Sequence, residues 1–203
     1  MKTMQLSKMS TVKPKLISMK PQENLPCSNL LNQQFNPEKP NQVWVSDITY
    51  IKTGSAFSYL CVVLDLFAQK VVSFRVANKA DAALVINTVS DAIRKRNPSS
   101  GLLFHFDRGA QFTSKPFRSF LDSNHITQSF SKAGHPWDNA VIESFFKYLK
   151  HEELSRRSFS NISILELALF EYLEDFYHHF RPHSFNNMLS PDQKELLFFQ
   201  YLS

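Results

Sequence analysis

The chain has little glycine and little cysteine, and both shortages narrow the kinds of protein it can be. Only 4 of its 203 residues are glycine and 2 are cysteine, which excludes collagen-like chains and small scaffolds held by disulfides. Cys27 and Cys61 lack the close spacing of a zinc site, and Cys61 lies in an apolar run, where we expect it to pack as a small hydrophobic side chain. Nothing here requires an oxidising compartment, so the cysteines indicate an intracellular protein.

Long apolar runs are also missing. The longest, residues 59–68, is interrupted by Asp65 and is too short to cross a bilayer. No apolar core of signal-peptide length follows the N-terminal methionine, and no phosphate-binding glycine motif indicates nucleotide-driven chemistry. We therefore expect a soluble, cytoplasmic protein with no membrane partner.

Apolar and aromatic residues are plentiful, and positive charge exceeds negative charge. Hydrophobic residues make up 43% of the chain, including 19 phenylalanines, which predicts a globular domain with a bulky core. The formal net charge is +5, which favours an acidic partner such as nucleic acid. Net charge alone does not identify the partner, because many basic proteins bind no DNA.

Three regions follow one another along the chain. Residues 1–40 carry five lysines before the first acid, Glu23, together with five prolines. This composition predicts a flexible basic tail or linker, with contact to DNA phosphates as the alternative use. Residues 41–157 carry alternating strand and helix patterns and are expected to form the core, and residues 158–203 a helical extension of it.

The core pattern predicts an α/β fold with a five-stranded mixed sheet flanked by helices. Short gaps between the first three strands favour an antiparallel meander. Helix starts are indicated by Asp138 or Asn139 as an N-cap, and by Ser163 with Glu166 as a capping box. The expected strands are 43–51, 57–66, 70–77, 102–106 and 126–130, and the expected helices are 81–96, 114–123, one after residue 139, and 163–180.

Three carboxylates stand out, although each alone has an ordinary explanation. Asp47 lies on an apolar strand face, where a carboxylate is costly unless it is paired, protonated or bound to a metal. Asp107 directly follows a buried strand, at the end where α/β sheets place ligands, but turns also favour aspartate. Glu143 shares a helix stripe with Lys147 and Lys150, which would also suit a solvated Glu–Lys pair.

Taken together, the three acids suit metal-dependent phosphoryl transfer. That chemistry uses oxygen ligands from separate elements around one or two cations. Magnesium needs only a few carboxylates beside water and substrate phosphate oxygens. Without cations, close carboxylates would repel one another, so metal binding would stabilise the ionised site. Lys147 and Lys150 would then lie beside the DNA backbone.

The spacing and the flanking residues resemble integrases and the transposases of insertion-sequence family three. Between Asp107 and Glu143 there are 143 − 107 − 1 = 35 residues, and Asp47 precedes them, which matches the family's Asp, Asp, thirty-five, Glu signature. The resemblance covers about residues 29–195. The matching segments are 41–50, 105–114 and 137–147, together with Arg181-Pro182-His183-Ser184 and Leu189-Ser190-Pro191.

This resemblance implies a ribonuclease-H-like fold and a DNA transposase. It implies that Asp47, Asp107 and Glu143 hold Mg²⁺ or Mn²⁺, with two ions expected in each active site. The implied reactions are cleavage at the element's ends and attack of the freed 3′-hydroxyl on target DNA. The implied partners are DNA and, since integrase-type enzymes act as multimers, further copies of the chain in a bacterial cytoplasm.

The sequence departs from the family mainly at its front. Only about forty residues precede Trp44, where the family usually has a helix-turn-helix segment. We therefore expect recognition of the element's ends to come from a separately encoded DNA-binding protein. Two alternatives stay open: a truncated, catalytically silent fragment that binds DNA or partner subunits, and a simple nuclease that cleaves without joining. Milder departures are Phe106, Ala110, Tyr177-His178 and Asn187-Met188.

Several other residues carry a functional and an ordinary interpretation. Arg108 is a candidate phosphate ligand or a neutralising neighbour of Asp107, and Trp137 is a candidate base-stacking residue or a staple before a helix. Asp65 is either a fourth metal ligand or a strand-end acid. The histidines 178, 179 and 183 lack the spacing and companions of a zinc site, so we expect them to be solvated or to face DNA.

Overall fold

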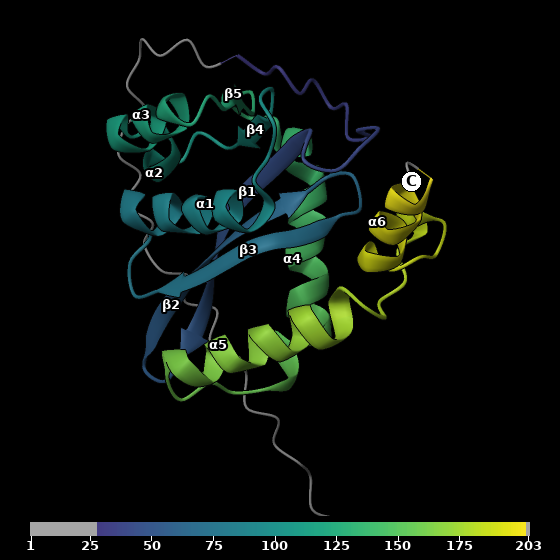
Figure 1. The fold of residues 1–203 in the computed structure, drawn as a ribbon. Helices are drawn as coiled ribbons and strands as arrows, with labels where there is room; N and C mark the ends of the chain where they lie inside the picture. Colours follow the sequence, from purple (N-terminus) through teal and green to yellow (C-terminus); the bar gives the residue numbers. More distant parts are fainter. Residues whose placement is uncertain (1–27, 202–203) are drawn as a thin grey trace, which may run out of the picture.

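A mixed sheet organises the part of the chain that the computed structural model describes, residues 28–201 (Figure 1). The strands lie in the order β3-β2-β1-β4-β5. The first three form the expected antiparallel meander, whereas β4 and β5 run parallel to β1. The strands are β1 (Val43–Thr53), β2 (Ala56–Asp65), β3 (Lys70–Ala77), β4 (Leu103–Phe106) and β5 (Thr127–Phe130).

The meander depends on a tight turn between β1 and β2. Gly54 occupies this turn with φ +56°, a left-handed conformation that glycine adopts without strain. A Cβ atom there would lie 2.9 Å from the backbone oxygen of Ser160. The turn therefore needs glycine both for its backbone angle and for the close approach of the segment before α5.

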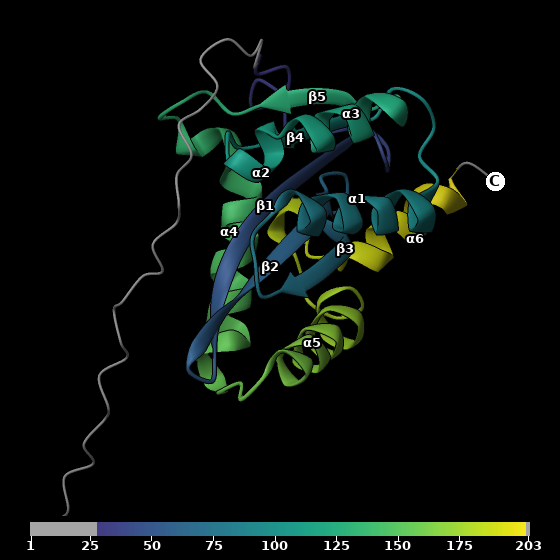
Figure 2. The same cartoon turned by 90° about the vertical axis from the view of Figure 1, so that its left-hand side faces the viewer.

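Helices cover both faces of the sheet (Figure 2). Because side chains alternate along a strand, Trp44 on β1 packs into the core beneath α1 and α3, and its neighbour Val45 packs into the core beneath α4 and α5. The first of these cores is rich in phenylalanine, with Phe106 stacked on Phe112 at 5.2 Å between ring centroids. The helices are α1 (Ala82–Arg96), α2 (Ala110–Thr113), α3 (Lys115–Ser123), α4 (Ala140–Glu152), α5 (Ile162–Phe170) and α6 (Pro191–Gln200).

The five predicted strands and the helices α1 and α3 are found within one or two residues of their expected ends. The helices after residue 160 and the short helix α2 differ from the prediction. Ser163 does not cap α5; the N-cap is Asn161, whose side chain accepts a hydrogen bond from the Ile164 amide. The expected single helix 163–180 is instead α5 followed by π-helical turns over Glu171–Tyr177. Helices α2 and α6 were not predicted, although Ser190 and Gln193 form a complete capping box at the start of α6.

The segment before β1 has no helix or strand among residues 28–40, but it is held against the sheet. Leu31 is only 2% exposed, and the Phe130 amide donates to the Ser28 carbonyl beside β5. Cys27 and the basic stretch before it lie outside the described residues. Among residues 28–201, no helix is long and apolar enough to cross a membrane.

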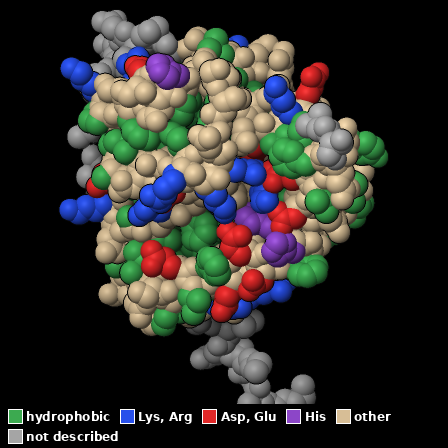
Figure 3. Space-filling model, in the orientation of Figure 1, with side chains coloured by type: hydrophobic (Ala, Val, Ile, Leu, Met, Phe, Trp, Pro, Cys, Tyr) green, Lys and Arg blue, Asp and Glu red, His purple; other side chains and the backbone are tan. Residues whose placement is uncertain are grey.

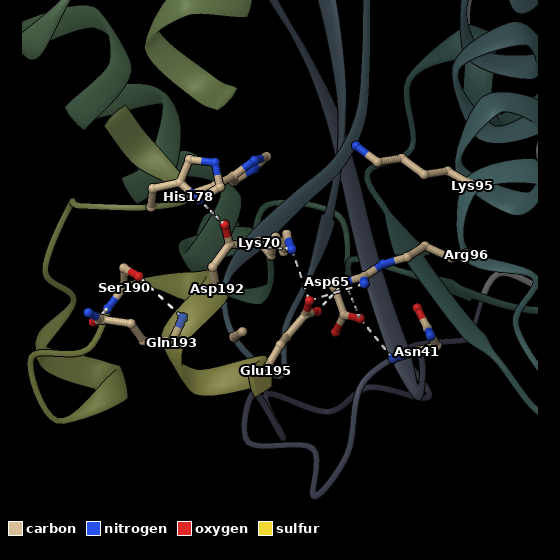
Figure 4. Close-up of polar contacts among 12 residues, drawn as sticks. Asn41, Asp65, Lys70, Lys95, Arg96, His178, Ser190, Asp192, Gln193 and Glu195 are labelled. Atoms are coloured by element: carbon tan, nitrogen blue, oxygen red, sulfur yellow. Dashed lines mark hydrogen bonds and ion pairs between the residues drawn. The ribbon is translucent and has the colours of Figure 1, made fainter. Parts of the chain in front are cut away.

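Helix α6 is fixed to the sheet by a buried group of charges (Figure 4). Glu195 pairs with Arg96 at the end of α1 and with Lys70 of β3, at 3.0 Å from the lysine Nζ. Asp65 is fully buried at the end of β2, where it accepts from the Asn41 amide at 2.7 Å. Asp65 is therefore a strand-end acid. Figure 3 shows acidic, basic and histidine side chains gathered on the surface between α5 and α6.

Removing the acid at the centre of this group should destabilise the fold. In Glu195→Ala, Arg96 stays largely buried and keeps only the more distant Asp65, at 3.8 Å, as a carboxylate partner, so the free energy of unfolding should fall by about 3 kcal/mol. Urea denaturation measures this change. The double variant Arg96→Met/Glu195→Leu should recover little of the loss, because the buried Asp65 then loses Arg96 as its cation. A loss below about 0.5 kcal/mol in Glu195→Ala would contradict this role.

Candidate active site

The register of two parallel strands brings Asp47 and Asp107 together. Ser46 of β1 pairs with Phe106 of β4; Asp47 is the next residue on β1, and Asp107 follows the last residue of β4. Alternation along β1 turns Asp47 toward the same side as Val45, which is the face that α4 covers. Their electrostatic coupling agrees with this closeness, because the charge of Asp107 raises the pKa of Asp47.

Asp47 is poorly placed to carry a charge by itself. Its Oδ1 accepts a hydrogen bond of 2.7 Å from the Ile48 amide, which favours the ionised form. Burial outweighs that bond and, together with the charges of Asp107 and Glu143, raises the pKa of Asp47 to about 7, while Lys150 acts in the opposite direction. A proton or a cation is therefore needed to stabilise this carboxylate at neutral pH.

Asp107 lies in the turn that leaves β4. Burial raises its pKa, and a hydrogen bond of 2.8 Å from the Gly109 amide to its Oδ1 opposes that shift. The backbone is close here, since a Cβ atom on residue 109 would lie 2.9 Å from the same oxygen. Asp107 thus lies in a turn, where aspartate is common in any protein, and it is also a neighbour of Asp47.

Glu143 approaches from the helix that covers this face. It is exposed, one turn into α4, where the buried side chains Ile142 and Phe146 fix the helix to the sheet. A hollow of about 370 Å³ separates the glutamate from β1. The lining residues are Asp47, Ile48, Thr49, Glu143, Phe146, Lys147 and Lys150.

The hollow contains two of the three predicted acids, and the third lies beside it. Asp107 does not line the hollow, although its charge acts on Asp47. Among residues 28–201 no group of three or more Asp, Glu, His or Cys side chains is close enough to hold a metal ion as it stands. Asp47 and Asp107 on the strand side and Glu143 across the hollow carry carboxylate oxygens, the type of ligand that magnesium and manganese prefer.

Two lysines of α4 face the same hollow. Lys147 and Lys150 are both exposed, and the Lys150 Nζ lies 5.6 Å from the centre of the Tyr50 ring. Burial lowers the pKa of Lys150, and the charge of Asp47 partly restores it. The arrangement places two cations next to the acids, where an anionic chain could lie. Tyr50 was not among the residues predicted for this site.

The other predicted DNA contacts lie outside the hollow. Arg108 donates from its Nε to the Ser131 carbonyl at 2.9 Å, which ties the turn after β4 to the end of β5. Trp137 is 52% exposed, with an edge contact to His135 at 5.0 Å between ring centroids. It is therefore not packed as a staple, and its contact with DNA stays a prediction.

The expectation for the three C-terminal histidines was partly wrong. His178 is 1% exposed and His183 is 6% exposed, so neither is solvated or faces a ligand. His178 pairs with Glu174 at 3.2 Å, and burial lowers the pKa of His183 to about 4. Only His179, which pairs with Asp192 of α6, is well exposed. These histidines belong to the packing of the C-terminal segment.

Two residues near the acids have buried polar roles that the sequence did not predict. Asp138 is not the N-cap of α4; that position belongs to Asn139, whose side chain makes no capping bond. Asp138 is 1% exposed, and hydrogen bonds from the Lys132 amide and Gln33 outweigh burial and lower its pKa. His105 on β4 is also fully buried, and burial lowers its pKa to about 4. A polar residue inside an apolar strand was the one signal for His105.

Known structures establish the fold. The integrase catalytic core domain of HTLV-2, in complex with magnesium, superimposes with a TM-score of 0.59 and 21% sequence identity over 79% of this chain and 99% of that one. The integrase of a simian T-cell lymphotropic virus intasome gives a TM-score of 0.66 at 20% identity, over 88% of this chain and 61% of the other. The predicted ribonuclease-H-like fold, a five-stranded mixed sheet with flanking helices, is therefore confirmed.

Sequence comparison gives the family. The transposase of insertion sequence element IS904 from Lactococcus lactis is 36% identical over 82% of this chain and 66% of its own length. The transposase InsF of insertion sequence IS3 from Escherichia coli is 36% identical over 84% of this chain and 60% of its own length, so the chain spans less than two thirds of either relative. Two family models described as Integrase core domain match residues 37–136 and 124–191. These matches together run from residue 37 to residue 191, and the chain belongs to the integrase core domain family.

Proposed function

We propose that this chain is the catalytic core of a DNA transposase that cleaves at element ends and joins the freed 3′-hydroxyl to target DNA. The observation that carries the proposal is that Asp47 on β1 and Asp107 directly after β4 lie close together across the β1–β4 pairing, with Glu143 across a hollow that also holds two lysines. The similarity to the IS904 and IS3 transposases supports the same reaction class.

In this proposal the three acids hold magnesium or manganese. Their carboxylate oxygens fit such hard cations, and the raised pKa of Asp47 is the expected state of a carboxylate group without its cation. When bound, one or two ions supply a Lewis acid for in-line displacement at phosphorus. Lys147 and Lys150 bind the DNA backbone beside the acids, and Arg108 and Trp137 contribute at the rim.

The chain is proposed to act within a larger assembly. Residues 41–157 form the catalytic core in this scheme, residues 158–203 a helical extension, and residues 1–40 a basic linker. The chain spans 60–66% of the length of the two transposases. In this proposal a separately encoded helix-turn-helix protein recognises the element ends. Further copies of the chain are expected in the active complex, which would work on DNA in the bacterial cytoplasm.

Replacing the helix carboxylate should abolish joining without disrupting the fold. Glu143→Gln keeps the shape of the exposed side chain but removes a metal ligand, so strand transfer of element-end DNA with Mg²⁺ or Mn²⁺ should fall by at least about 100-fold. Glu166→Gln on the outer surface of α5 is the matched control and should stay active.

The same assay separates the competing functions. If the unaltered chain and Glu143→Gln bind DNA equally and are equally inactive, the catalytically silent fragment is the correct interpretation. Cleavage of generic DNA or of RNA–DNA hybrids without joining would instead identify a simple nuclease. Joining that depends on Glu143 supports the transposase.

Loss of a lysine at the hollow should weaken DNA binding in a salt-dependent manner. Lys150→Ala removes one phosphate contact, so the slope of log binding constant against log salt should decrease in magnitude by about 1. Fluorescence anisotropy with a labelled duplex at several salt concentrations measures this slope. Lys115→Ala, an exposed lysine at the start of α3 on the other face of the sheet, should leave it unchanged.

The raised pKa of Asp47 should reduce the stability of the metal-free protein as pH rises. The pKa is about 7 in the folded protein against 3.8 for an ordinary aspartate, so the folded state holds an extra proton between these values. The stability contribution of Asp47 is then fully present below pH 4 and is lost as pH rises through 7.

Asp47→Asn cannot ionise and should escape this loss. At pH 8 its free energy of unfolding should exceed that of the unaltered chain by about 2 kcal/mol in EDTA, and the two should converge near pH 4. Urea denaturation across this range provides the measurement. Magnesium should reduce this difference in the free energy of unfolding, because it stabilises the ionised carboxylate. An Asp47→Asn variant that is less stable than the unaltered chain at pH 8 would contradict the destabilising effect of ionised Asp47.

A further inference from the structure

A buried carboxylate outside the proposed metal site joins the N-terminal strap, residues 28–33, to the start of helix α4. Asp138 is 1% exposed. Its Oδ2 accepts hydrogen bonds from the Asn29 side chain at 2.8 Å and from the Lys132 amide at 2.9 Å. Its Oδ1 accepts from the Gln33 side chain at 3.0 Å. Three donors from two separate segments therefore converge on one carboxylate, five residues before Glu143.

The same strap is also tied to the strand that leads to Asp107. The Ser129 hydroxyl accepts from the backbone amides of Leu30 at 3.0 Å and Leu31 at 3.1 Å. That hydroxyl lies 2.8 Å from Nδ1 of the buried His105 ring, and the Ser131 hydroxyl lies 3.1 Å from Nε2. His105 is on β4, two residues before Asp107. The strap thus makes one set of bonds to the strand side of the site and another to the helix side.

Helix α4 needs such an attachment at its first turn. Its N-cap residue, Asn139, makes no side-chain hydrogen bond to the helix, although a capping bond is the usual way to fix a helix start. Buried apolar residues from Ile142 onward hold one side of the helix against the sheet, whereas Glu143 itself is exposed. The bonds of Asp138 are the polar link that fixes this end of the helix relative to β4 and β5.

We infer that Asp138 is a positioning residue: through the strap and the Lys132 loop it sets the distance of Glu143 from Asp107, and so the fit of the cation between them. This inference rests on the proposed function, because it assigns to Asp138 the geometry of that metal site. Groups that orient metal-binding side chains affect affinity strongly, commonly by about 10- to 100-fold.

Two variants of one residue test the inference. Asp138→Ala leaves three donors without an acceptor, whereas Asp138→Asn keeps one acceptor oxygen and lets the Gln33 amide rotate to present its own oxygen. Binding of Mn²⁺ to the DNA-free protein, followed by electron paramagnetic resonance, should weaken by about tenfold in Asp138→Ala and recover most of that loss in Asp138→Asn. Strand-transfer kcat should follow the same order, with the KM for DNA within about twofold. Asp175→Asn, an exposed carboxylate of the π-helical turns, is the control.

The outcomes separate the inference from the proposed function. A folded Asp138→Ala protein with unchanged Mn²⁺ affinity overturns the positioning role, as does an Asn variant as damaged as the Ala variant. If Asp138→Ala does not fold, Gln33→Ala is the second variant, because it removes a single hydrogen-bond donor to Asp138 from an exposed side chain. It should weaken Mn²⁺ binding by about twofold to threefold. Unchanged Mn²⁺ binding in Gln33→Ala overturns the positioning role of Asp138. If the unaltered chain binds Mn²⁺ but joins no DNA, the proposed reaction fails while the affinity measurements still decide the role of Asp138. If it binds no Mn²⁺, both fail.

Discussion

The parallel pairing of β1 with β4 is the interaction on which the candidate site depends. It brings Asp47, on the face of β1 that α4 covers, close to Asp107, which follows the end of β4. Like charges at that distance are unfavourable in a partly buried setting, and the pKa of Asp47 records the cost. The rest of the fold makes the pairing stable: phenylalanines fill the core beneath the far face, and apolar residues of α4 fill the near one.

The site is assembled from elements with different degrees of constraint. Asp47 belongs to the centre of the sheet, where hydrogen bonds to neighbouring strands fix the backbone, and Asp107 follows the end of β4. Glu143 belongs to a helix that faces them across the hollow. In the proposed function, a bound cation would define the separation across the hollow.

Much of this architecture could be predicted from the sequence because its signals are local. Alternating or continuous apolar runs predicted β1 to β5, whereas Asp47, Asp107 and Glu143 were singled out only when their placement was combined with the spacing and flanking residues that resemble the family. The failures have physical causes as well. Asp138 looked like a cap because caps are commonly aspartate, but its partners, Asn29 and Gln33, are more than a hundred residues away. The charged attachment of α6 through Arg96 and Glu195 is equally remote in sequence, and no local pattern reveals such pairs.

The separation of the two aspartates along the chain has a consequence for how the protein is made. Asp47 and Asp107 are 107 − 47 = 60 residues apart, and the β1–β4 pairing closes only after the meander and the α1 crossover have formed. Such non-local pairing is a slow step in folding, because loop closure costs entropy before contacts compensate for it. During synthesis, β1 to β3 emerge and can pair while the second acid is still unmade. The proposed site is thus absent from every nascent chain that ends before β4, and it lacks Glu143 until α4 has been made.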